Sequence, residues 1–238
     1  MKKATLIVSG GMDSATLAYH YSKLGYELHL VGFDYGQRHV KELLALRNLA
    51  DVLNATYEIV DLKGLKSSIA NSSLTSDDIV VPDGHYAEET MRITVVPNRN
   101  AIMLSIATGI AVANGSELVG TGVHSGDHFI YPDCRPDFIE AINKAFILGT
   151  QGHSVETFRV EAPFVQILKS DIAALGHEYG VPYQLTWSCY KGGDKHCGRC
   201  GTCVERIEAF IDAGVNDPTL YEDGIEFALE EIAKHNNA

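Results

Sequence analysis

The chain has 238 residues, of which 45% are hydrophobic and 21% charged, so it is long and apolar enough for a folded core and is not a disordered protein. Acidic residues outnumber basic ones by 31 to 19, which gives a formal net charge of −12. This balance argues against a nucleic-acid partner, because phosphate backbones attract clustered positive charge, and it favours a small-molecule substrate. The apolar run near the N-terminus is too short for a signal peptide, and we expect no segment to be long enough to span a membrane. We therefore expect a cytoplasmic protein without a membrane partner.

The first motif is a strand that leads through two glycines into a helix. The apolar, β-branched run Leu6–Val8 is typical of a buried strand. Asp13 or Ser14 is expected to cap the helix that follows the glycines. Backbone N–H groups of such a turn, together with the helix dipole, favour a bound phosphate. The turn lacks the Lys-Ser/Thr of one common phosphate loop and the third glycine of the dinucleotide fingerprint, so it predicts a phosphate site of another kind.

Beyond this turn, strand and helix patterns alternate along the chain. The alternation predicts right-handed βαβ units, and hence a doubly wound α/β domain over residues 1–180, with a mainly parallel sheet and helices on both faces. Such sheets bind ligands at the carboxyl ends of their strands, where the glycine turn falls. The further expected strands are Glu27–Phe33, Thr56–Leu62, Glu117–Gly122 and Val155–Glu161. The expected helices are Val40–Leu53, Ala101–Ala113, Pro136–Leu148, Ser170–Tyr179 and Cys203–Ala213.

Two segments have their own character. The helix at Ala101–Ala113 consists of small and apolar residues and is expected to be fully buried. Lys63–Val96 is irregular, rich in Ser, Asp and Gly, and is expected to form an excursion over the site. A last, acidic helical stretch is expected from Asp217 onward.

Four of the five cysteines are close together near the C-terminus, with two-residue gaps between the last three. They are Cys189, Cys197, Cys200 and Cys203. Such spacing lets thiolates converge on one metal ion, and a closed shell of four thiolates around zinc is structural. An iron–sulfur cluster is the alternative. The odd cysteine count argues against a disulfide framework, and Cys134 is expected to be a free thiol. Residues 181–238 are therefore expected to form a helical zinc-binding segment.

Several charged residues follow predicted strands or stand at helix starts. Arg38 follows the second strand, where its planar fork can pair with a phosphate or a carboxylate, unless it is only a solvated charge. Arg99 stands at the N-terminus of a predicted buried helix, where a cation is unfavourable unless an anion is nearby. Lys169 precedes a helix and is expected by default to be an exposed lysine. Histidines among residues 122–128 are more typical of a surface than of a ligand site.

Together these motifs resemble the 7-cyano-7-deazaguanine synthases, a family of PP-loop ATP pyrophosphatases. Ser9-Gly-Gly-Met-Asp-Ser14 matches the PP-loop signature, although Ala15 stands where a hydroxyl residue is common. The more selective features are Tyr131-Pro-Asp-Cys-Arg135 and Cys197-Gly-Arg-Cys-Gly-Thr-Cys203. Tyr35-Gly-Gln-Arg-His39 and Pro97-Asn-Arg-Asn100 also match, so the resemblance covers nearly the whole chain.

The resemblance implies an ATP-dependent carbon–nitrogen ligase. Such an enzyme converts 7-carboxy-7-deazaguanine and ammonia to the nitrile, through an adenylated acid and an adenylated amide, and releases AMP and pyrophosphate. The resemblance also implies structural zinc, magnesium with ATP, and a homodimer. The expected ATP-binding stretch comprises Val8, Ser9, Gly10, Gly11, Met12, Asp13, Ser14, Ala15, Thr16, Leu17 and Ala18.

Roles for single residues follow from this resemblance. Asp13 is expected to bind magnesium and Ser14 the pyrophosphate, while Arg99 and Lys169 neutralise phosphate charge. Asp133 is expected to accept hydrogen bonds from the N–H edge of the heterocycle. Arg38 or Arg135 is expected to face the substrate's carboxylate.

Two other functions stay open from the sequence. One is a PP-loop enzyme that thiolates tRNA, in which the cysteines would hold an iron–sulfur cluster or relay sulfur. The acidic charge balance speaks against this function. The other is a non-catalytic nucleotide-binding sensor, in which zinc only stabilises the fold.

Overall fold

The computed structural model describes residues 2–37, 41–65, 72–74, 80–86 and 91–237. Its five strands form one sheet in the order β3-β2-β1-β4-β5, and every neighbouring pair is parallel. The chain runs outward from β1 through β2 to β3, then returns past β1 to β4 and β5. The strands are β1 (Lys3–Ile7), β2 (Glu27–Asp34), β3 (Thr56–Asp61), β4 (Leu118–Gly120) and β5 (Arg159–Glu161).

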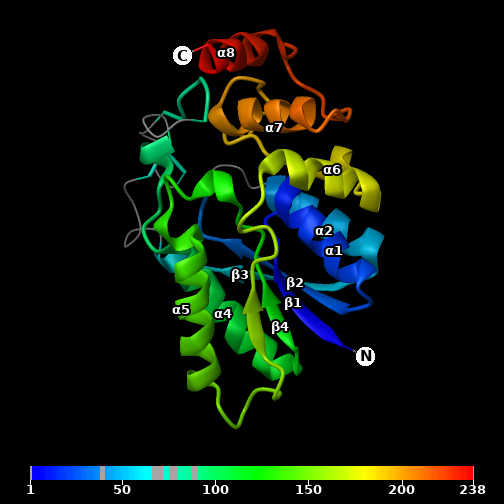
Figure 1. Ribbon diagram of the computed structural model, residues 1–238, viewed down its shortest axis with the longest axis vertical. Helices are drawn as coiled ribbons and strands as arrows, with labels where there is room; N and C mark the ends of the chain where they lie inside the picture. The colour runs from blue at the N-terminus through cyan, green and yellow to red at the C-terminus, as the bar shows by residue number, and fades with distance from the viewer. Residues whose placement is uncertain (1, 38–40, 66–71, 75–79, 87–90, 238) are drawn as a thin grey trace.

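Helices cover both faces of this sheet, which confirms the doubly wound α/β class (Figure 1). Helices α1, α2 and α6 lie on one face and α4 and α5 on the other, while α7 and α8 stack beyond α6 toward the C-terminus. The helices are α1 (Met12–Lys23), α2 (Lys41–Leu53), α4 (Arg99–Asn114), α5 (Pro136–Gly149), α6 (Lys169–Tyr179), α7 (Gly201–Asp212) and α8 (Glu226–Asn236).

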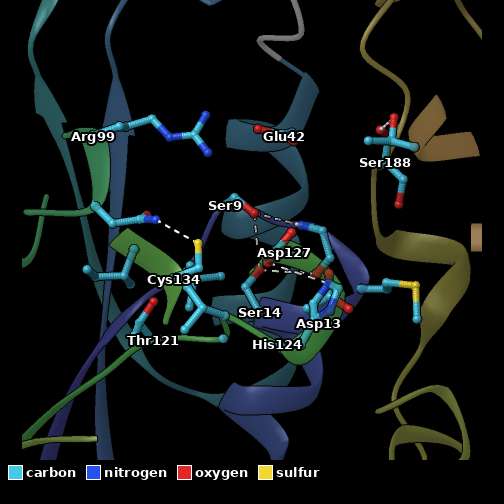
Figure 2. Close-up of a pocket in the computed structure, with 18 of the residues that line it drawn as sticks. Ser9, Asp13, Ser14, Glu42, Arg99, Thr121, His124, Asp127, Cys134 and Ser188 are labelled. Atoms are coloured by element: carbon cyan, nitrogen blue, oxygen red, sulfur yellow. Dashed lines mark hydrogen bonds and ion pairs between the residues drawn. The ribbon is translucent and has the colours of Figure 1, made fainter. Parts of the chain in front are cut away.

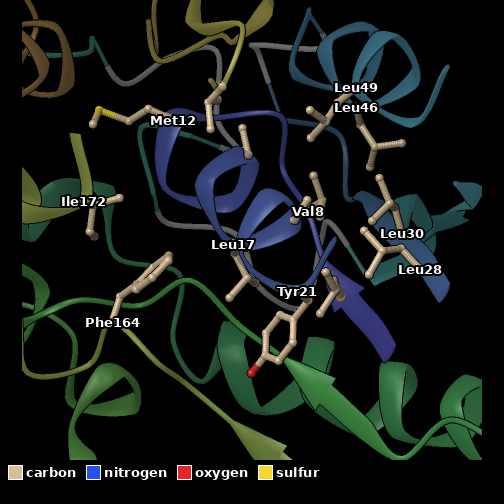
Figure 3. Close-up of a cluster of buried hydrophobic side chains, with 14 of the residues drawn as sticks. Val8, Met12, Leu17, Tyr21, Leu28, Leu30, Leu46, Leu49, Phe164 and Ile172 are labelled. Carbon is tan, nitrogen blue, oxygen red and sulfur yellow. The ribbon is translucent and has the colours of Figure 1, made fainter. Parts of the chain in front are cut away.

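The largest hydrophobic cluster surrounds α1 (Figure 3). Leu17 and the other apolar residues of α1 pack between Leu46 on α2 and Ile172 on α6. The same cluster includes Tyr183 and Phe210, which lie beyond residue 180. The C-terminal segment thus shares one core with the α/β domain.

Several features differ from the sequence expectations, and the strand expected at Val155–Glu161 is present only as Arg159–Glu161. Helix α1 begins at Met12 with Gly11 as its N-cap and without a side-chain cap, so Asp13 and Ser14 are inside the helix and do not cap it. The helix at Ala101–Ala113 is part of α4, which is not fully buried, because one face packs on the sheet and the other is partly exposed. The last helix begins at Glu226, well after Asp217.

One helical run, Arg92–Asn114, is long and apolar enough by length and composition to cross a membrane, with 23 residues and a hydropathy of 1.2. The expectation that no segment reaches this length is therefore wrong by that criterion. The run is weak evidence for a membrane span, because core helices pass the same test. Leu104, Ala107 and Ala111 of α4 pack with Val119 of β4 in a hydrophobic cluster of this fold.

Candidate active site

A cavity of about 220 Å³ opens at the carboxyl ends of β1, β2 and β4 (Figure 2). Its walls come from the glycine turn after β1, from residues that follow β2 and β4, from the first turn of α4 and from the cysteine segment. The order of the sheet reverses between β1 and β4, and doubly wound sheets bind ligands at such a switch point. The sequence predicts a ligand site at this edge of the sheet, and the cavity lies at the same edge.

The glycine turn after β1 is built for a close approach to a ligand. Gly10 has a φ of +90°, and a Cβ atom there would lie 2.3 Å from the carbonyl oxygen of Glu42, so no larger residue fits. The Gly11 N–H donates to Ser9 Oγ at 3.3 Å, and Ser9 Oγ lies 3.3 Å from Ser14 Oγ. Helix α1 begins directly after this turn, so its free N–H groups and two hydroxyls form a cradle for an anion.

The expected ATP-binding stretch divides between cavity and core. Its members that line the cavity are Val8, Ser9, Gly11, Met12, Asp13 and Ser14. Ala15, Leu17 and Ala18 are fully buried in the cluster around α1. Thr16 Oγ1 lies 2.9 Å from the hydroxyl of Tyr183. The second half of the stretch therefore packs the helix that carries the phosphate cradle.

Lys169 lies between two carboxylates beside this cradle. Its Nζ is 3.2 Å from Asp13 Oδ2 and 2.7 Å from Glu205 Oε2. Burial disfavours the ammonium, but the carboxylates of Asp13 and Glu205 outweigh burial and hold the pKa of Lys169 above its ordinary value. Burial also raises the pKa of Glu205, although Lys169 opposes this. The lysine therefore stays charged and acts as a fixed cation.

The carboxylate of Asp13 has a second oxygen that no protein group satisfies. Asp13 Oδ1 is buried and has no hydrogen-bond partner among the described residues. Two carboxylates against one ammonium leave one net negative charge in the group of Asp13, Lys169 and Glu205. An unpaired carboxylate oxygen in a negatively charged group fits Mg²⁺, which prefers oxygen ligands and bound phosphates.

Arg99 is on the other side of the cavity, at the first position of α4 (Figure 2). Its Nη1 donates a long hydrogen bond, 3.4 Å, to the hydroxyl of Tyr35. Nearby, Asn100 Nδ2 donates to Cys134 Sγ at 3.1 Å, and burial raises the pKa of this thiol. Cys134 is thus a protonated, buried thiol, as expected for a free cysteine, and not a ready nucleophile.

The residues expected to bind the substrate lie in different surroundings. Asp133 Oδ2 accepts the backbone N–H of Asn100 at 2.9 Å, so it holds the first turn of α4. Arg135 is exposed and donates to the carbonyl oxygen of His128. Neither side chain is among the described residues that line the cavity. Arg38 lies outside the described residues.

The cysteine cluster forms a compact centre beside the cavity. The four Sγ atoms lie within 4.8 Å of one another, and Cys197 Sγ is 3.9 Å from Cys203 Sγ. Zn–S bonds of about 2.3 Å in a tetrahedron place neighbouring sulfurs about 3.8 Å apart, so the spacing fits zinc and is too long for a disulfide. His196 is not part of the centre, because its Nε2 accepts the N–H of Ser188 at 3.0 Å.

The same segment builds a wall of the cavity. Ser188 and Tyr190 flank Cys189, and Thr202 lies between Cys200 and Cys203; all three line the cavity. The Trp187 N–H donates to the carbonyl oxygen of Gly10 at 2.9 Å and so joins this wall to the glycine turn.

Several cavity residues have no clear signal in the sequence. Asp127 accepts a hydrogen bond from the Tyr86 hydroxyl at 3.2 Å and lies 3.6 Å from His124 Nε2. Glu205 follows the last cysteine by two positions on α7 and reaches Lys169. A polar run after a predicted buried strand points weakly to His124 and Asp127, whereas only the fold brings Glu205 and Tyr86 to the site.

Comparisons with known proteins agree with this architecture. Residues 3–214 match the protein family described as queuosine biosynthesis protein QueC. The 7-cyano-7-deazaguanine synthase of Brucella anthropi is 52% identical over 237 residues, which cover 98% of this chain and 99% of that protein. The protein of the same name from Brucella ovis is 52% identical over 224 residues, 93% of this chain and 94% of that protein.

Among solved structures, the NH3-dependent NAD synthetase from Campylobacter jejuni is 15% identical with a TM-score of 0.47, over 98% of this chain and 85% of that chain. The family match extends over most of the chain, and the synthases from Brucella match it nearly from end to end. The chain belongs to the family of the queuosine biosynthesis protein QueC.

Proposed function

We propose that this chain is a 7-cyano-7-deazaguanine synthase, which joins ammonia to 7-carboxy-7-deazaguanine at the expense of ATP. The observation that carries the proposal is one cavity that combines a PP-loop phosphate cradle with an arginine and several tyrosines, in a chain of this family. The phosphates of ATP need the phosphate cradle and a planar acid needs the arginine and the tyrosines, and the two groups must lie side by side for the reaction.

The chemistry requires that both oxygens of the carboxylate become good leaving groups. A carboxylate oxygen attacks the α-phosphorus of ATP, pyrophosphate leaves, and ammonia displaces AMP to give the amide. The amide oxygen then attacks the α-phosphorus of a second ATP and displaces pyrophosphate, and loss of AMP together with both protons of the nitrogen leaves the nitrile. Positioning and charge neutralisation dominate such a reaction, because the protein forms no covalent bond to substrate.

The residues of the glycine turn have defined tasks in this scheme. Ser9, Gly10, Gly11 and Ser14 bind the pyrophosphate through hydroxyl and N–H groups at the start of α1. Lys169, held by two carboxylates, neutralises phosphate charge. Asp13 Oδ1 would hold magnesium, which offsets the charge of the triphosphate when bound.

The other side of the cavity holds the substrate. Arg99 provides a second positive charge there. Asp133 holds the first turn of α4, which carries Arg99, because its carboxylate accepts the backbone N–H of the neighbouring Asn100. We include Arg38 and Arg135 as residues that contact the substrate when it enters.

The cysteine centre would hold a structural zinc ion, since four thiolates form a closed shell that leaves no position for a substrate. We divide the chain into a nucleotide-binding part, residues 1–180, and a zinc-binding part, residues 181–238. A cytoplasmic homodimer without nucleic-acid or membrane partners is the state we propose for the enzyme.

The purified protein tests the proposal directly. It is incubated with ATP, magnesium, an ammonium salt and 7-carboxy-7-deazaguanine, and the products are followed by mass spectrometry. The nitrile together with AMP is the expected result. Zinc and ATP binding without AMP release from this acid would leave the fold intact and overturn the function.

A further inference from the structure

Arg99 differs from Lys169, the other Lys or Arg side chain among the described residues that line the cavity. Lys169 contacts two carboxylates, and His124 lies 3.6 Å from Asp127. Among the residues that the structure describes, no ion pair joins Arg99 to a carboxylate, and its hydrogen bond to the Tyr35 hydroxyl is long, at 3.4 Å. A half-buried guanidinium without a counter-charge is unfavourable, so an anion that enters the cavity completes this side of it.

The start of α4 makes this cation more costly. The positive end of the helix dipole lies at Arg99, where a cation is destabilising. Asn98, just before it, has a φ of +57°, a left-handed conformation that few non-glycine residues adopt. Backbone strain of this kind is concentrated at functional sites. The carboxylate of Asp133 accepts the Asn100 N–H, and among the described residues it makes no ion pair with the guanidinium.

The surroundings of Arg99 fit a planar aromatic acid. Tyr35, Tyr131 and Tyr190 line the same cavity, and the first two are buried. A guanidinium binds a carboxylate through two parallel N–H···O contacts, and tyrosine rings pack against a flat heterocycle. Figure 2 shows Arg99 apart from Asp13 and Ser14, across the cavity from the phosphate cradle.

We propose that Arg99 binds the carboxylate of the acid substrate, with the tyrosines against its ring, rather than a phosphate of ATP. This inference rests on the proposed function. It gives Arg99 a larger role in the first half of the reaction, in which the acid binds, than in the second half, in which the amide reacts. The acid is an anion, whereas the amide intermediate is neutral. Arg99 therefore contributes more to binding of the acid than to binding of the amide, and it selects acids as starting substrates.

The variant Arg99→Gln tests this difference, because it removes the charge and keeps a hydrogen-bonding amide. With the acid as starting substrate, KM should rise by about 10- to 100-fold. With the corresponding amide, KM should change by less than about 3-fold, since a neutral hydrogen bond is weaker. The KM for ATP should stay unchanged, and Arg99→Lys should recover part of the affinity for the acid.

Arg47→Gln is the matched control, because Arg47 is an exposed arginine on α2 and should leave all three values unchanged. Zinc content and melting temperature report whether Arg99→Gln folds. Equal losses for acid and amide, or a rise in the KM for ATP alone, would overturn the inference. A rise in the KM for the acid in Arg135→Gln but not in Arg99→Gln would move the carboxylate to the surface arginine and overturn it as well.

Turnover of the acid by the unaltered enzyme decides the proposed function separately. Calorimetric titration of acid and amide, without ATP, compares the unaltered protein with Arg99→Gln even where turnover is absent. If the unaltered protein converts the acid while both proteins bind it equally, only the inference about Arg99 fails. If the unaltered protein neither binds nor converts the acid, both proposals fail.

Discussion

Lys169 and Arg99 illustrate how two cations in one cavity come to have different tasks. The charge of Lys169 is matched by Asp13 and Glu205, so the lysine is held in place before any ligand arrives. The charge of Arg99 has no such match in the described chain, so it is available to a substrate. The family resemblance implied phosphate neutralisation for both residues, and the sequence contains no information on which acidic side chains fold against them.

Asp13 gives the sharpest prediction for a single residue. Asp13→Asn removes the buried oxygen that suits magnesium and one partner of Lys169. We expect AMP release to fall by at least about 100-fold, with zinc content unchanged, because the lost charge acts on the phosphates alone. Asp51→Asn, at an exposed position on α2, is the control. Turnover within a few-fold of the unaltered enzyme would contradict the assignment of the glycine turn.

His196 predicts a pH dependence of stability. Burial, with the nearby Arg206, lowers the pKa of His196 to about 4, and its Nε2 must be unprotonated to accept the Ser188 N–H. Since the pKa in the folded state lies below the unfolded value of about 6.5, this contribution is complete above pH 6.5. It is lost as the pH falls toward 4, at up to about 1.4 kcal/mol per pH unit.

Urea denaturation between pH 7 and pH 4 measures this slope. The comparison with His196→Gln is essential, because loss of zinc at low pH affects both proteins and cancels in the difference. The variant should lose less stability with acid than the unaltered protein. Parallel slopes would exclude this histidine as the source.

At the level of elements, α7 is held by one buried arginine. Arg206 is fully buried, and its guanidinium donates to both carboxylate oxygens of Asp217 at 3.0 and 3.1 Å. It also donates to Thr186 Oγ1 at 2.8 Å and to the carbonyl oxygen of Tyr183 at 3.3 Å. One side chain thus joins α7 to the cysteine segment and to the loop before α8.

Removing the carboxylate should therefore be costly. Asp217→Asn leaves a buried guanidinium without its counter-charge, and we expect a loss of about 3–5 kcal/mol in the free energy of unfolding. Asp223→Asn changes an exposed aspartate of the same loop and should alter stability by less than about 0.5 kcal/mol. Equal unfolding midpoints in urea for the two variants would show that this ion pair does not hold α7.

The sequence predicts the elements of this fold well where periodicity is strong, as in the helix Pro136–Leu148, which differs from α5 by one residue. The sequence does not predict burial or helix starts correctly where tertiary packing determines them. The apolar composition of α4 suggests full burial, but a helix on an open sheet buries one face. Asp13 and Ser14 have the chemistry of caps, but the turn ends earlier, which frees both side chains for the cavity.

The site is predictable only in part for a similar reason. The glycine turn and the cysteines are local motifs, so spacing alone identifies them. Glu205 and Arg206 follow Cys203 on α7, and Arg206 lies on the buried face of this helix, where the sequence pattern leads us to expect apolar residues. Their partners, Lys169 and Asp217, lie far away or in another element, and only the fold brings them together.

Over the whole molecule, the cysteine centre and the phosphate cradle form one unit. Trp187, the only tryptophan of the chain, donates through its backbone N–H to Gly10 and through its indole to the carbonyl oxygen of Cys189. Its ring also lies 4.3 Å from the ring of His196. A change in the geometry of the cysteine centre is therefore transmitted to the cavity through Trp187.

Removal of the metal tests this coupling. A metal-free protein, prepared with a chelator and a thiol reagent, should lose turnover, melt at a lower temperature and show a shifted tryptophan emission. Return of zinc should restore all three. A metal-free enzyme with full turnover and unchanged emission would show that the centre does not support the cavity.

The fate of the substrate's oxygens tests the central claim most directly. The acid is labelled with ¹⁸O in both carboxylate positions, and the products are separated and weighed by mass spectrometry. Attack on the α-phosphorus in each half of the reaction predicts that both labels leave in AMP, one per molecule, and that the nitrile carries none. Label in inorganic phosphate or water, or a product that retains it, would contradict a double adenylation in this cavity.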